Sequence, residues 1–242
     1  MNHGRLGYHL RRMEKLVRHD STGKVYQLTD EGRLAYECWI RLLSHTAERC
    51  LDLKVSAKHN PVRYAGRLSL GDHACFLYED EVVRRMVLSS FLGMGLLKDL
   101  AVVYVTCEER INHEAKEIRT SGIDVERLEK KGAFTMMSAE EWYLRRGKAS
   151  PNAIIDNWLN LLREKMKEGY KGVQAAEETT VFLSNAKASQ LLSYENKLRN
   201  HFPKNLCALC MVDARRLQPE QAISLIKAHR HGVFNGIAFP LQ

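Results

Sequence analysis

The sequence predicts an α/β fold for most of the chain, with a mostly parallel sheet covered by helices on both faces. From Leu68 onward, apolar strand-like runs alternate with amphipathic segments, an order typical of parallel sheets. The runs LAVVYVT and NLCALCMVD are apolar at odd and even positions alike, as strands buried on both faces must be. With 242 residues, 45% of them hydrophobic, the chain is long enough to bury such a core.

Each expected element follows from this alternation. Apolar runs of strand length predict strands at 73–78, 100–106, 132–137, 171–178, 205–213 and 233–239. Longer segments with helical periodicity predict helices at 81–97, 108–122, 151–169, 185–202 and 219–232. Ligands bind beyond the carboxyl ends of the strands in such sheets. These ends are Tyr78–Glu79, Cys107–Glu108, Glu177–Glu178 and Asp213, which form an acidic set.

Charge divides the chain into two parts. The net charge is +8, and residues 1–66 hold 12 Lys and Arg against 7 Asp and Glu, whereas residues 67–242 hold 25 against 22. A basic segment ahead of a near-neutral body is typical of a polyanion-binding head on a globular domain. We therefore expect a DNA-binding segment at 1–52, a polar linker at 53–66 and an α/β domain at 67–242.

The composition argues against a membrane protein and against a secreted, disulfide-linked protein. No apolar run reaches the roughly 18 residues of a membrane span, and the N-terminus lacks the apolar stretch of a signal peptide. Six cysteines in mostly apolar surroundings favour buried reduced thiols over a disulfide framework. A cytoplasmic protein without a cofactor or a membrane partner is expected.

The N-terminal segment has the order helix, hairpin, helix. A helix over Arg5–Val17 gathers Leu6, Leu10 and Met13 on one side and basic residues on the other. Two short β-like runs flank the turn-forming cluster Asp20-Ser21-Thr22-Gly23, and a helix follows at 31–51. From the helix alone, a solvated basic face is the simpler interpretation.

The pattern HLRRMEKLV…GKVYQLTDEGR resembles the ArsR-like winged helix-turn-helix over about residues 4–45. The resemblance implies a helix in the major groove and a wing on the DNA backbone. The DNA-binding residues would then be Arg5, Tyr8, His9, Arg11, Arg12, Lys15 and Lys24. Further helices precede the recognition helix in that family, and this sequence has no room for them. We expect one of three explanations: a misassigned start, a truncated chain, or a remnant that is stable as a dimer. Leu34, Trp39, Leu42 and Leu43 are expected either to pair subunits in a homodimer or to cover the segment's own core.

The order of elements in the body is similar to the RecA-like core of KaiC-type ATPases. Such an enzyme needs the phosphate-binding loop GxxxxGK[ST] directly after its first strand. This chain has FLYEDEVVRRM there, with Glu79, Asp80 and Glu81 where a triphosphate would lie. Carboxylates repel phosphates, so no enzyme of this class is expected and ATP binding is only an alternative.

A second resemblance spans nearly all of residues 67–239. The motifs LGDHACFLYED, SYENKLRNHF, LCMVDARRL and IKAHRHGVF resemble, in order and spacing, the MEDS domain, a sensory domain of methanogen and methylotroph regulators. This family is regarded as a RecA-like derivative that lacks the phosphate loop. Its members are proposed to sense small, hydrocarbon-like compounds. The resemblance implies ligand-binding roles for His73, Tyr78, Glu178, Glu195, Cys210, Asp213 and His229. A tryptophan common in the family is replaced by Val181.

Each of these residues also has a purely structural interpretation. Glu178 and Asp213 end strands at the expected ligand site, which favours function, whereas Glu195 would equally suit a solvated helix face. Cys207 and Cys210 form a CxxC, but residues three apart on a strand point to opposite faces, so no metal site is expected from them. A redox or metal sensor that uses His73, Cys75, Cys107 and His229 remains an alternative. The main prediction is a transcription regulator whose α/β domain binds a small effector and changes DNA binding.

Overall fold

The computed structural model describes residues 17–19, 26–29, 60–145, 148–180, 183, 188–234 and 237–241. The chain forms two compact units, Met1–Leu53 and Lys54–Gln242. In the first unit, strand β1 (Val17–His19) pairs antiparallel with β2 (Tyr26–Leu28), which confirms the predicted pair of strands. The predicted DNA-binding residues Arg5, Tyr8, His9, Arg11, Arg12, Lys15 and Lys24 lie outside the described residues, as do the helix at 31–51 and Val181.

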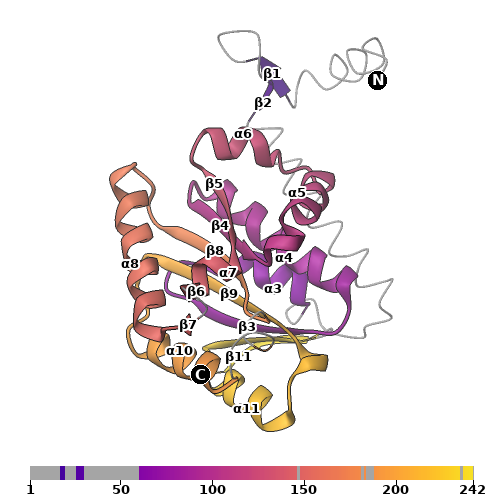
Figure 1. Cartoon of the computed structure of the whole chain (residues 1–242). Helices are drawn as coiled ribbons and strands as arrows, with labels where there is room; N and C mark the ends of the chain where they lie inside the picture. Colours follow the sequence, from indigo (N-terminus) through magenta and orange to yellow (C-terminus); the bar gives the residue numbers. More distant parts are fainter. Residues whose placement is uncertain are drawn as a thin grey trace. The chain divides into compact units, whose positions relative to one another are not determined.

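The second unit is built on a seven-stranded sheet in the order β11-β10-β3-β9-β8-β4-β5 (Figure 1). Six of its strands are parallel, and β11 at one edge runs antiparallel to β10. The strands are β3 (His73–Tyr78), β4 (Ala101–Thr106), β5 (Phe134–Ser138), β8 (Val173–Glu178), β9 (Leu206–Asp213), β10 (His231–Phe234) and β11 (Ile237–Pro240). The predicted α/β class with a mostly parallel sheet is confirmed.

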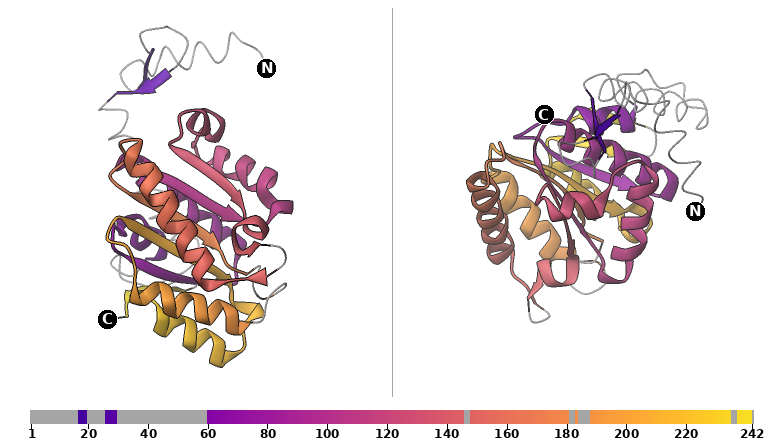
Figure 2. Two further views of the ribbon diagram at one scale, coloured as in Figure 1. Left: turned by 60° about the vertical axis from the view of Figure 1, so that its left-hand side comes forward. Right: turned by 90° about the horizontal axis from the view of Figure 1, so that it is seen from above.

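Helices cover both faces of this sheet, as Figure 2 shows from above. One face carries α3 (Pro61–Arg67), α4 (Glu81–Leu97), α5 (Ile111–Thr120) and α6 (Val125–Lys130). The other face carries α8 (Pro151–Lys167), α10 (Ala188–Asn200) and α11 (Pro219–Ala228). Short pieces complete the unit: the 3₁₀ turns η1 (Glu108–Arg110) and η2 (Ala214–Arg216), helix α7 (Ala139–Tyr143), and a hairpin of β6 (Leu144–Arg145) with β7 (Lys148–Ala149).

Burial of the central strands explains why their sequences do not alternate. Every residue of β3, β4 and β8 is buried, because helices exclude water from both faces of the sheet. Close packing of α4 on the sheet depends on Gly95, where an added Cβ would lie 2.9 Å from Val102 and from Gln174. The Gln174 side chain donates to the carbonyl of Phe91 in the same helix.

Two elements differ from those expected from the sequence: a helix lies within the expected linker, and the last expected strand is divided into two. Residues 61–66, expected in the linker, belong to α3, whose Val62 and Ala65 are buried; the Ser90 hydroxyl of α4 donates to the Val62 carbonyl at 2.9 Å. At seven residues, this helix is too short to display a helical period. The run at 233–239 was expected to be one strand, but it divides between β10 and β11, and it contains Asn235-Gly236, a strong hairpin signal.

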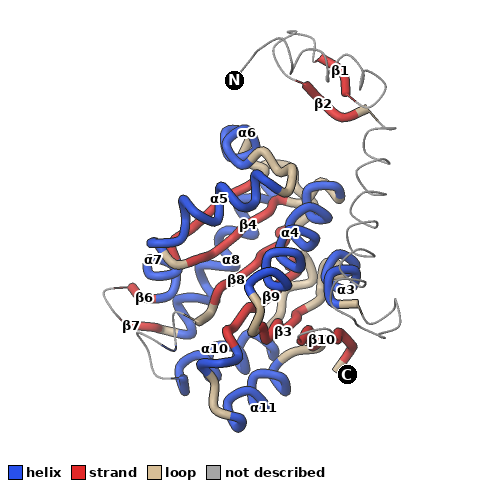
Figure 3. The backbone as a smooth tube through the Cα atoms, turned by 90° about the vertical axis from the view of Figure 1, so that its right-hand side faces the viewer, coloured by secondary structure: helices blue, strands red, loops and turns tan. Residues whose placement is uncertain are grey.

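Among the described residues, no helix combines the length and the apolar character that a membrane span requires. The tube in Figure 3 shows the strands between the two helical layers of the second unit. Within this unit, the carboxyl ends of β3, β8 and β9 lie side by side, because these three strands are adjacent and parallel. Tyr78, Glu178 and Asp213, each the last residue of its strand, therefore lie together at the carboxyl-terminal end of the sheet.

Candidate functional site

The seven ligand-binding residues expected from the sequence fall on three places in the fold. Tyr78 and Glu178 lie at the carboxyl ends of their strands, on the face covered by α4. His73, Glu195, Cys210 and His229 meet on the other face, beneath α10 and α11. Asp213 lies at a strand end but pairs with Arg215, an exposed neighbour on η2. The structure thus divides six of the seven predicted residues between two separate clusters and leaves Asp213 outside both.

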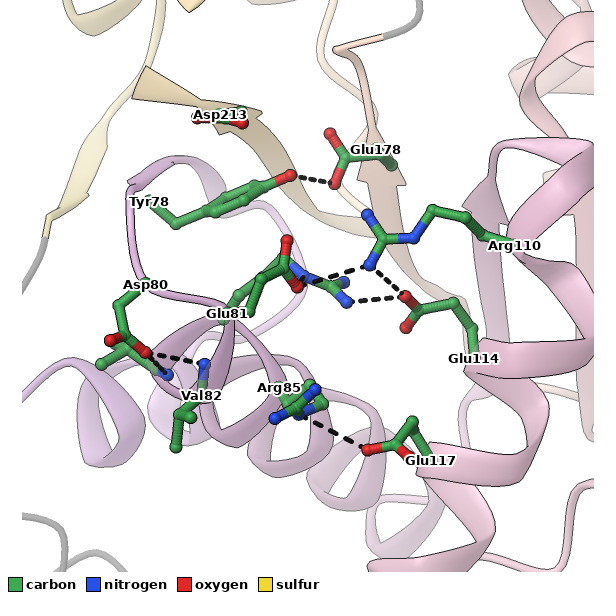
Figure 4. Close-up of polar contacts among 12 residues, drawn as sticks. Tyr78, Asp80, Glu81, Val82, Arg85, Arg110, Glu114, Glu117, Glu178 and Asp213 are labelled. Atoms are coloured by element: carbon green, nitrogen blue, oxygen red, sulfur yellow. Dashed lines mark hydrogen bonds and ion pairs between the residues drawn. The ribbon is translucent and has the colours of Figure 1, made fainter. Parts of the chain in front are cut away.

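The turn from β3 into α4 lies where a nucleotide-binding protein of this architecture places its phosphate loop. Here the Asp80 carboxylate caps the helix, accepting hydrogen bonds from the backbone nitrogens of Val82 at 2.7 Å and Val83 at 2.9 Å (Figure 4). The N-terminus of a helix binds anions through its free backbone nitrogens. In this chain the Asp80 carboxylate occupies that position at the start of α4.

Directly behind this turn lies a network of charged side chains that we call the strand-end cluster: Tyr78, Glu81, Arg84, Arg110, Glu114 and Glu178. Arg84 is 1% exposed, and its guanidinium donates to Glu81 at 2.7 Å and to Glu114 at 2.6 Å. Arg110 reaches the same two carboxylates at 3.3 and 2.7 Å. Burial works against ionisation of Glu81, but the two arginines lower the pKa of its carboxyl group below the usual value.

Glu178 and Tyr78 form the inner part of the strand-end cluster. The Tyr78 hydroxyl donates to Glu178 Oε2 at 2.9 Å, and the Thr180 hydroxyl donates to Glu178 Oε1. Burial raises the pKa of both Glu178 and Tyr78, and the Glu178 charge raises that of Tyr78 further. The Asp213 backbone nitrogen donates to Thr180 Oγ1 at 3.1 Å, which links the end of β9 to this network.

The second group, which we call the histidine cluster, consists of His73, Glu195, Cys210 and His229. Each of the four residues is at most 1% exposed, and one ligating atom from each lies within 4.8 Å of the others. His73 Nε2 lies 3.3 Å from Cys210 Sγ and 3.3 Å from Glu195 Oε2, and His229 Nε2 lies 3.4 Å from the same oxygen. Strands β3 and β9, helix α10 and the C-terminal end of helix α11 therefore converge on one point.

Hydrogen bonds around the histidine cluster fix its members. The His229 Nδ1 lies 2.7 Å from the Leu225 carbonyl and must donate to it, because a carbonyl oxygen only accepts. The His73 ring stacks on Phe202 with centroids 4.7 Å apart. Three buried atoms of the cluster, His73 Nδ1, Glu195 Oε1 and His229 Nε2, have no hydrogen-bond partner among the described residues. Such buried atoms are rare in native proteins and often mark a ligand or functional site.

Burial strongly shifts the ionisation of this face. Burial, together with the neighbouring His229, lowers the pKa of His73 to about 4, so the ring is neutral at pH 7. Burial alone would raise the pKa of Glu195, but His229 and His73 lower it to about 2. Glu177 nearby accepts from the Tyr143 hydroxyl at 2.7 Å and the Tyr194 hydroxyl at 3.0 Å, and burial raises its pKa to about 8.

Several members of the strand-end cluster were not predicted from the sequence. Arg84, Arg110 and Glu114 lie in helical segments and look like surface charges; the only available signal is that Glu81–Arg84 and Arg110–Glu114 have helical contact spacing. The alternative metal set contained His73 and His229, which lie together in the structure, but they are grouped with Glu195 and Cys210 and not with Cys75 and Cys107. Glu195 is fully buried, so its interpretation as a solvated residue is wrong.

A comparison with protein-family models decides the family. The model described as the methanogen/methylotroph, DcmR sensory domain (MEDS) matches residues 72–230. The chain belongs to the MEDS family. The match contains all seven ligand-binding residues expected from the sequence and both clusters of the MEDS domain. A sensory role follows for the domain, whereas no family model matches the N-terminal segment in support of a winged helix-turn-helix.

Solved structures share the fold of this MEDS domain at low sequence identity. An uncharacterized protein from Pyrococcus horikoshii in complex with an unknown peptide is 12% identical, with a TM-score of 0.57 over 74% of this chain and 87% of the other. A KaiC-like protein of the same archaeon is 15% identical, with a TM-score of 0.48 over 69% and 72%. The flagellar accessory protein FlaH from Methanocaldococcus jannaschii is 11% identical, with a TM-score of 0.45 over 74% and 78%. A search of curated proteins gave no match.

Proposed function

We propose that this MEDS protein is a transcription regulator whose α/β domain binds a small effector at the strand-end cluster. The family match supports a sensory role for the domain. The single observation that carries the choice of site is the buried polar network at the carboxyl ends of β3 and β8, where ligands bind in open parallel sheets. Effector binding there changes the affinity of the basic N-terminal segment for DNA.

The chemistry of the strand-end cluster defines the effector class. Glu114 Oε2 is buried without a hydrogen-bond partner, and Arg110 and Glu81 at the rim are 33% and 39% exposed. Carboxylates accept hydrogen bonds, so this site suits a compact molecule that carries a hydroxyl or an amine. Small alcohols and amines fit this description.

A nucleotide does not fit the same place. The Asp80 carboxylate already accepts from the first free nitrogens of α4, and Glu81 lies beside it. Phosphate oxygens would meet two carboxylates at the position where other proteins offer backbone nitrogens and a lysine. We therefore assign a binding role to the domain in place of ATP hydrolysis.

The DNA-binding half of the proposal depends on the sequence of the N-terminal segment. Its excess of Lys and Arg and its resemblance to a winged helix-turn-helix support contacts from Arg12 and Lys15 to DNA phosphates. A homodimer would present two such segments, as the palindromic operators of this class require. The effector acts as a switch only if it binds one arrangement of these segments more tightly than the other.

The proposal is tested by measuring binding of a labelled DNA fragment from upstream of the gene, at several salt concentrations, with and without methanol or methylamine. We expect the small molecule to change the Kd for DNA at least threefold in the unmodified protein. Arg12→Ala with Lys15→Ala should weaken DNA binding and reduce the slope of log K against log salt by about 1.8, because each lost phosphate contact removes about 0.9.

The control separates sensing from DNA binding. Tyr78→Phe with Glu178→Gln should leave DNA affinity and its salt slope unchanged but abolish the response to the small molecule, because both side chains lie in the strand-end cluster. An unaltered salt slope after the Arg12 and Lys15 substitutions contradicts the DNA-binding role. An unaltered small-molecule response after the Tyr78 and Glu178 substitutions contradicts the assigned site.

A further inference from the structure

We infer that the histidine cluster is a binding site for a zinc-class divalent ion, held by His73 Nε2, Glu195, Cys210 Sγ and His229 Nε2. The inference goes beyond the proposed effector function, since the cluster lies on the opposite face of the sheet from the strand-end cluster. The main sequence-based expectation was a chain without a metal site, and the alternative metal set combined His73 and His229 with Cys75 and Cys107, so the ligand set inferred here differs from both.

The donor geometry carries the inference. Zinc binds nitrogen and oxygen at about 2.0–2.2 Å and sulfur at about 2.3 Å in a tetrahedron, so its ligand atoms lie about 3.3–3.8 Å apart. From Glu195 Oε2, the distances are 3.3 Å to His73 Nε2, 3.4 Å to His229 Nε2 and 3.9 Å to Cys210 Sγ. The His73 Nε2 to Cys210 Sγ distance is 3.3 Å. All four distances fall in or next to the tetrahedral range.

The ligand types and their total charge agree with this assignment. Two imidazoles, one thiolate and one carboxylate form the mixed donor set that zinc prefers over magnesium or calcium. With neutral imidazoles, the thiolate and the carboxylate together carry two negative charges, which a divalent ion balances. Within the part of the chain that the structure describes, the ion-pair partners of the fully buried Glu195 are His73 and His229, and no lysine or arginine side chain pairs with it.

Supporting hydrogen bonds orient the ligands. Because His229 Nδ1 donates to the Leu225 carbonyl, its Nε2 presents a lone pair to the cluster. Metal-ligating histidines commonly have this arrangement. The Cys210 sulfur also lies 4.0 Å from Glu177 Oε1. The other carboxylate oxygen of Glu177, Oε2, accepts hydrogen bonds from the hydroxyls of Tyr143 and Tyr194. The scaffold consists of strands β3 and β9 and helices α10 and α11, so the ligands are positioned by rigid elements.

The test uses the full chain, freed of metal with a chelator and titrated with Zn²⁺ and separately with Co²⁺. We expect one ion per chain, and a visible thiolate-to-cobalt charge-transfer band. Cys210→Ser should abolish this band and weaken zinc binding by at least about 100-fold, more than the loss of a supporting partner costs. Cys207→Ala is the matched control, because this buried thiol belongs to the same CxxC but not to the cluster; it should leave both readouts unchanged.

Three outcomes would overturn the inference: fewer than half an equivalent of tightly bound zinc, a cobalt spectrum without a thiolate band, or equal zinc affinity in the unmodified protein and Cys210→Ser. Should Cys210→Ser fail to fold, His73→Gln provides the same comparison, with stoichiometry and affinity as the readouts. Since DNA binding and the small-molecule response are measured separately, failure of the metal site leaves the proposed function intact, and the converse also holds.

Discussion

Replacing Arg84 with methionine is expected to lower the free energy of unfolding by about 3–5 kcal/mol, the usual cost of removing one partner from a buried ion pair. Arg84 is 1% exposed and donates to Glu114, which is equally buried, at 2.6 Å. It also donates to the Tyr104 hydroxyl at 3.2 Å. Methionine fills much of the volume but leaves the Glu114 carboxylate in a low-dielectric site with only Arg110 as a counter-charge. Urea denaturation measures the change.

Arg85 provides a matched control one residue further along α4. Its guanidinium lies 3.5 Å from Glu117, and both side chains are about one-third exposed. Surface pairs of this kind contribute at most about 1 kcal/mol, so Arg85→Met should be almost neutral. The double variant Arg84→Met with Glu114→Gln should recover part of the lost stability, because it removes the uncompensated charge. Equal effects of Arg84→Met and Arg85→Met would contradict the network.

Replacing Trp158 with alanine is expected to destabilise the protein by about 3–5 kcal/mol through the cavity that it leaves. Trp158 on α8 is 1% exposed, belongs to the core on the α8, α10 and α11 face, and packs edge-on against Trp142 with ring centroids 4.7 Å apart. Its indole nitrogen donates to the Tyr194 hydroxyl at 3.0 Å, and Tyr194 in turn donates to Glu177. Thermal unfolding monitored by circular dichroism measures the loss.

Two further variants separate packing from hydrogen bonding at this position. Trp158→Phe keeps an aromatic ring but loses the indole donor, so it should cost less than alanine, about 1–3 kcal/mol. Ile223→Ala removes an aliphatic side chain of α11 that is 51% exposed, and surface changes of this kind fall within about 0.5 kcal/mol. A Trp158→Ala variant as stable as Ile223→Ala would show that Trp158 does not anchor this core.

The sequence predicts the fold well where the physical signal is local. Strand β3 and helix α4 match their expected ranges, because a short apolar run marks the strand and a long segment with helical periodicity, capped by Asp80, marks the helix. Helices α6 and α7 were not expected, since at six and five residues they span too few turns for a period. The last run was expected to be one strand and divides into β10 and β11; the sequence signal for this division, Asn235-Gly236, was not used because it lies inside an apolar stretch.

The sequence predicts the members of the site better than their grouping. Each of His73, Glu195, Cys210 and His229 was singled out, but their meeting depends on the placement of β9 beside β3 and on the packing of α10 and α11. Strand order cannot be read from periodicity, so the two clusters could not be separated. Burial of Arg84 and Glu114 is likewise a tertiary effect, since each charge is buried only because the other accompanies it.

We propose that the chain's own carboxylates, Asp80 and Glu81, close the position where this fold would bind a nucleotide, and that the domain is a receptor. Isothermal titration of the full chain with Mg-ATP tests it most directly, with a P-loop ATPase as positive control. We expect no saturable binding at nucleotide concentrations up to about 1 mM, which corresponds to a binding free energy weaker than about 4 kcal/mol. Stoichiometric binding with a micromolar Kd that Arg110→Ala weakens would contradict the claim.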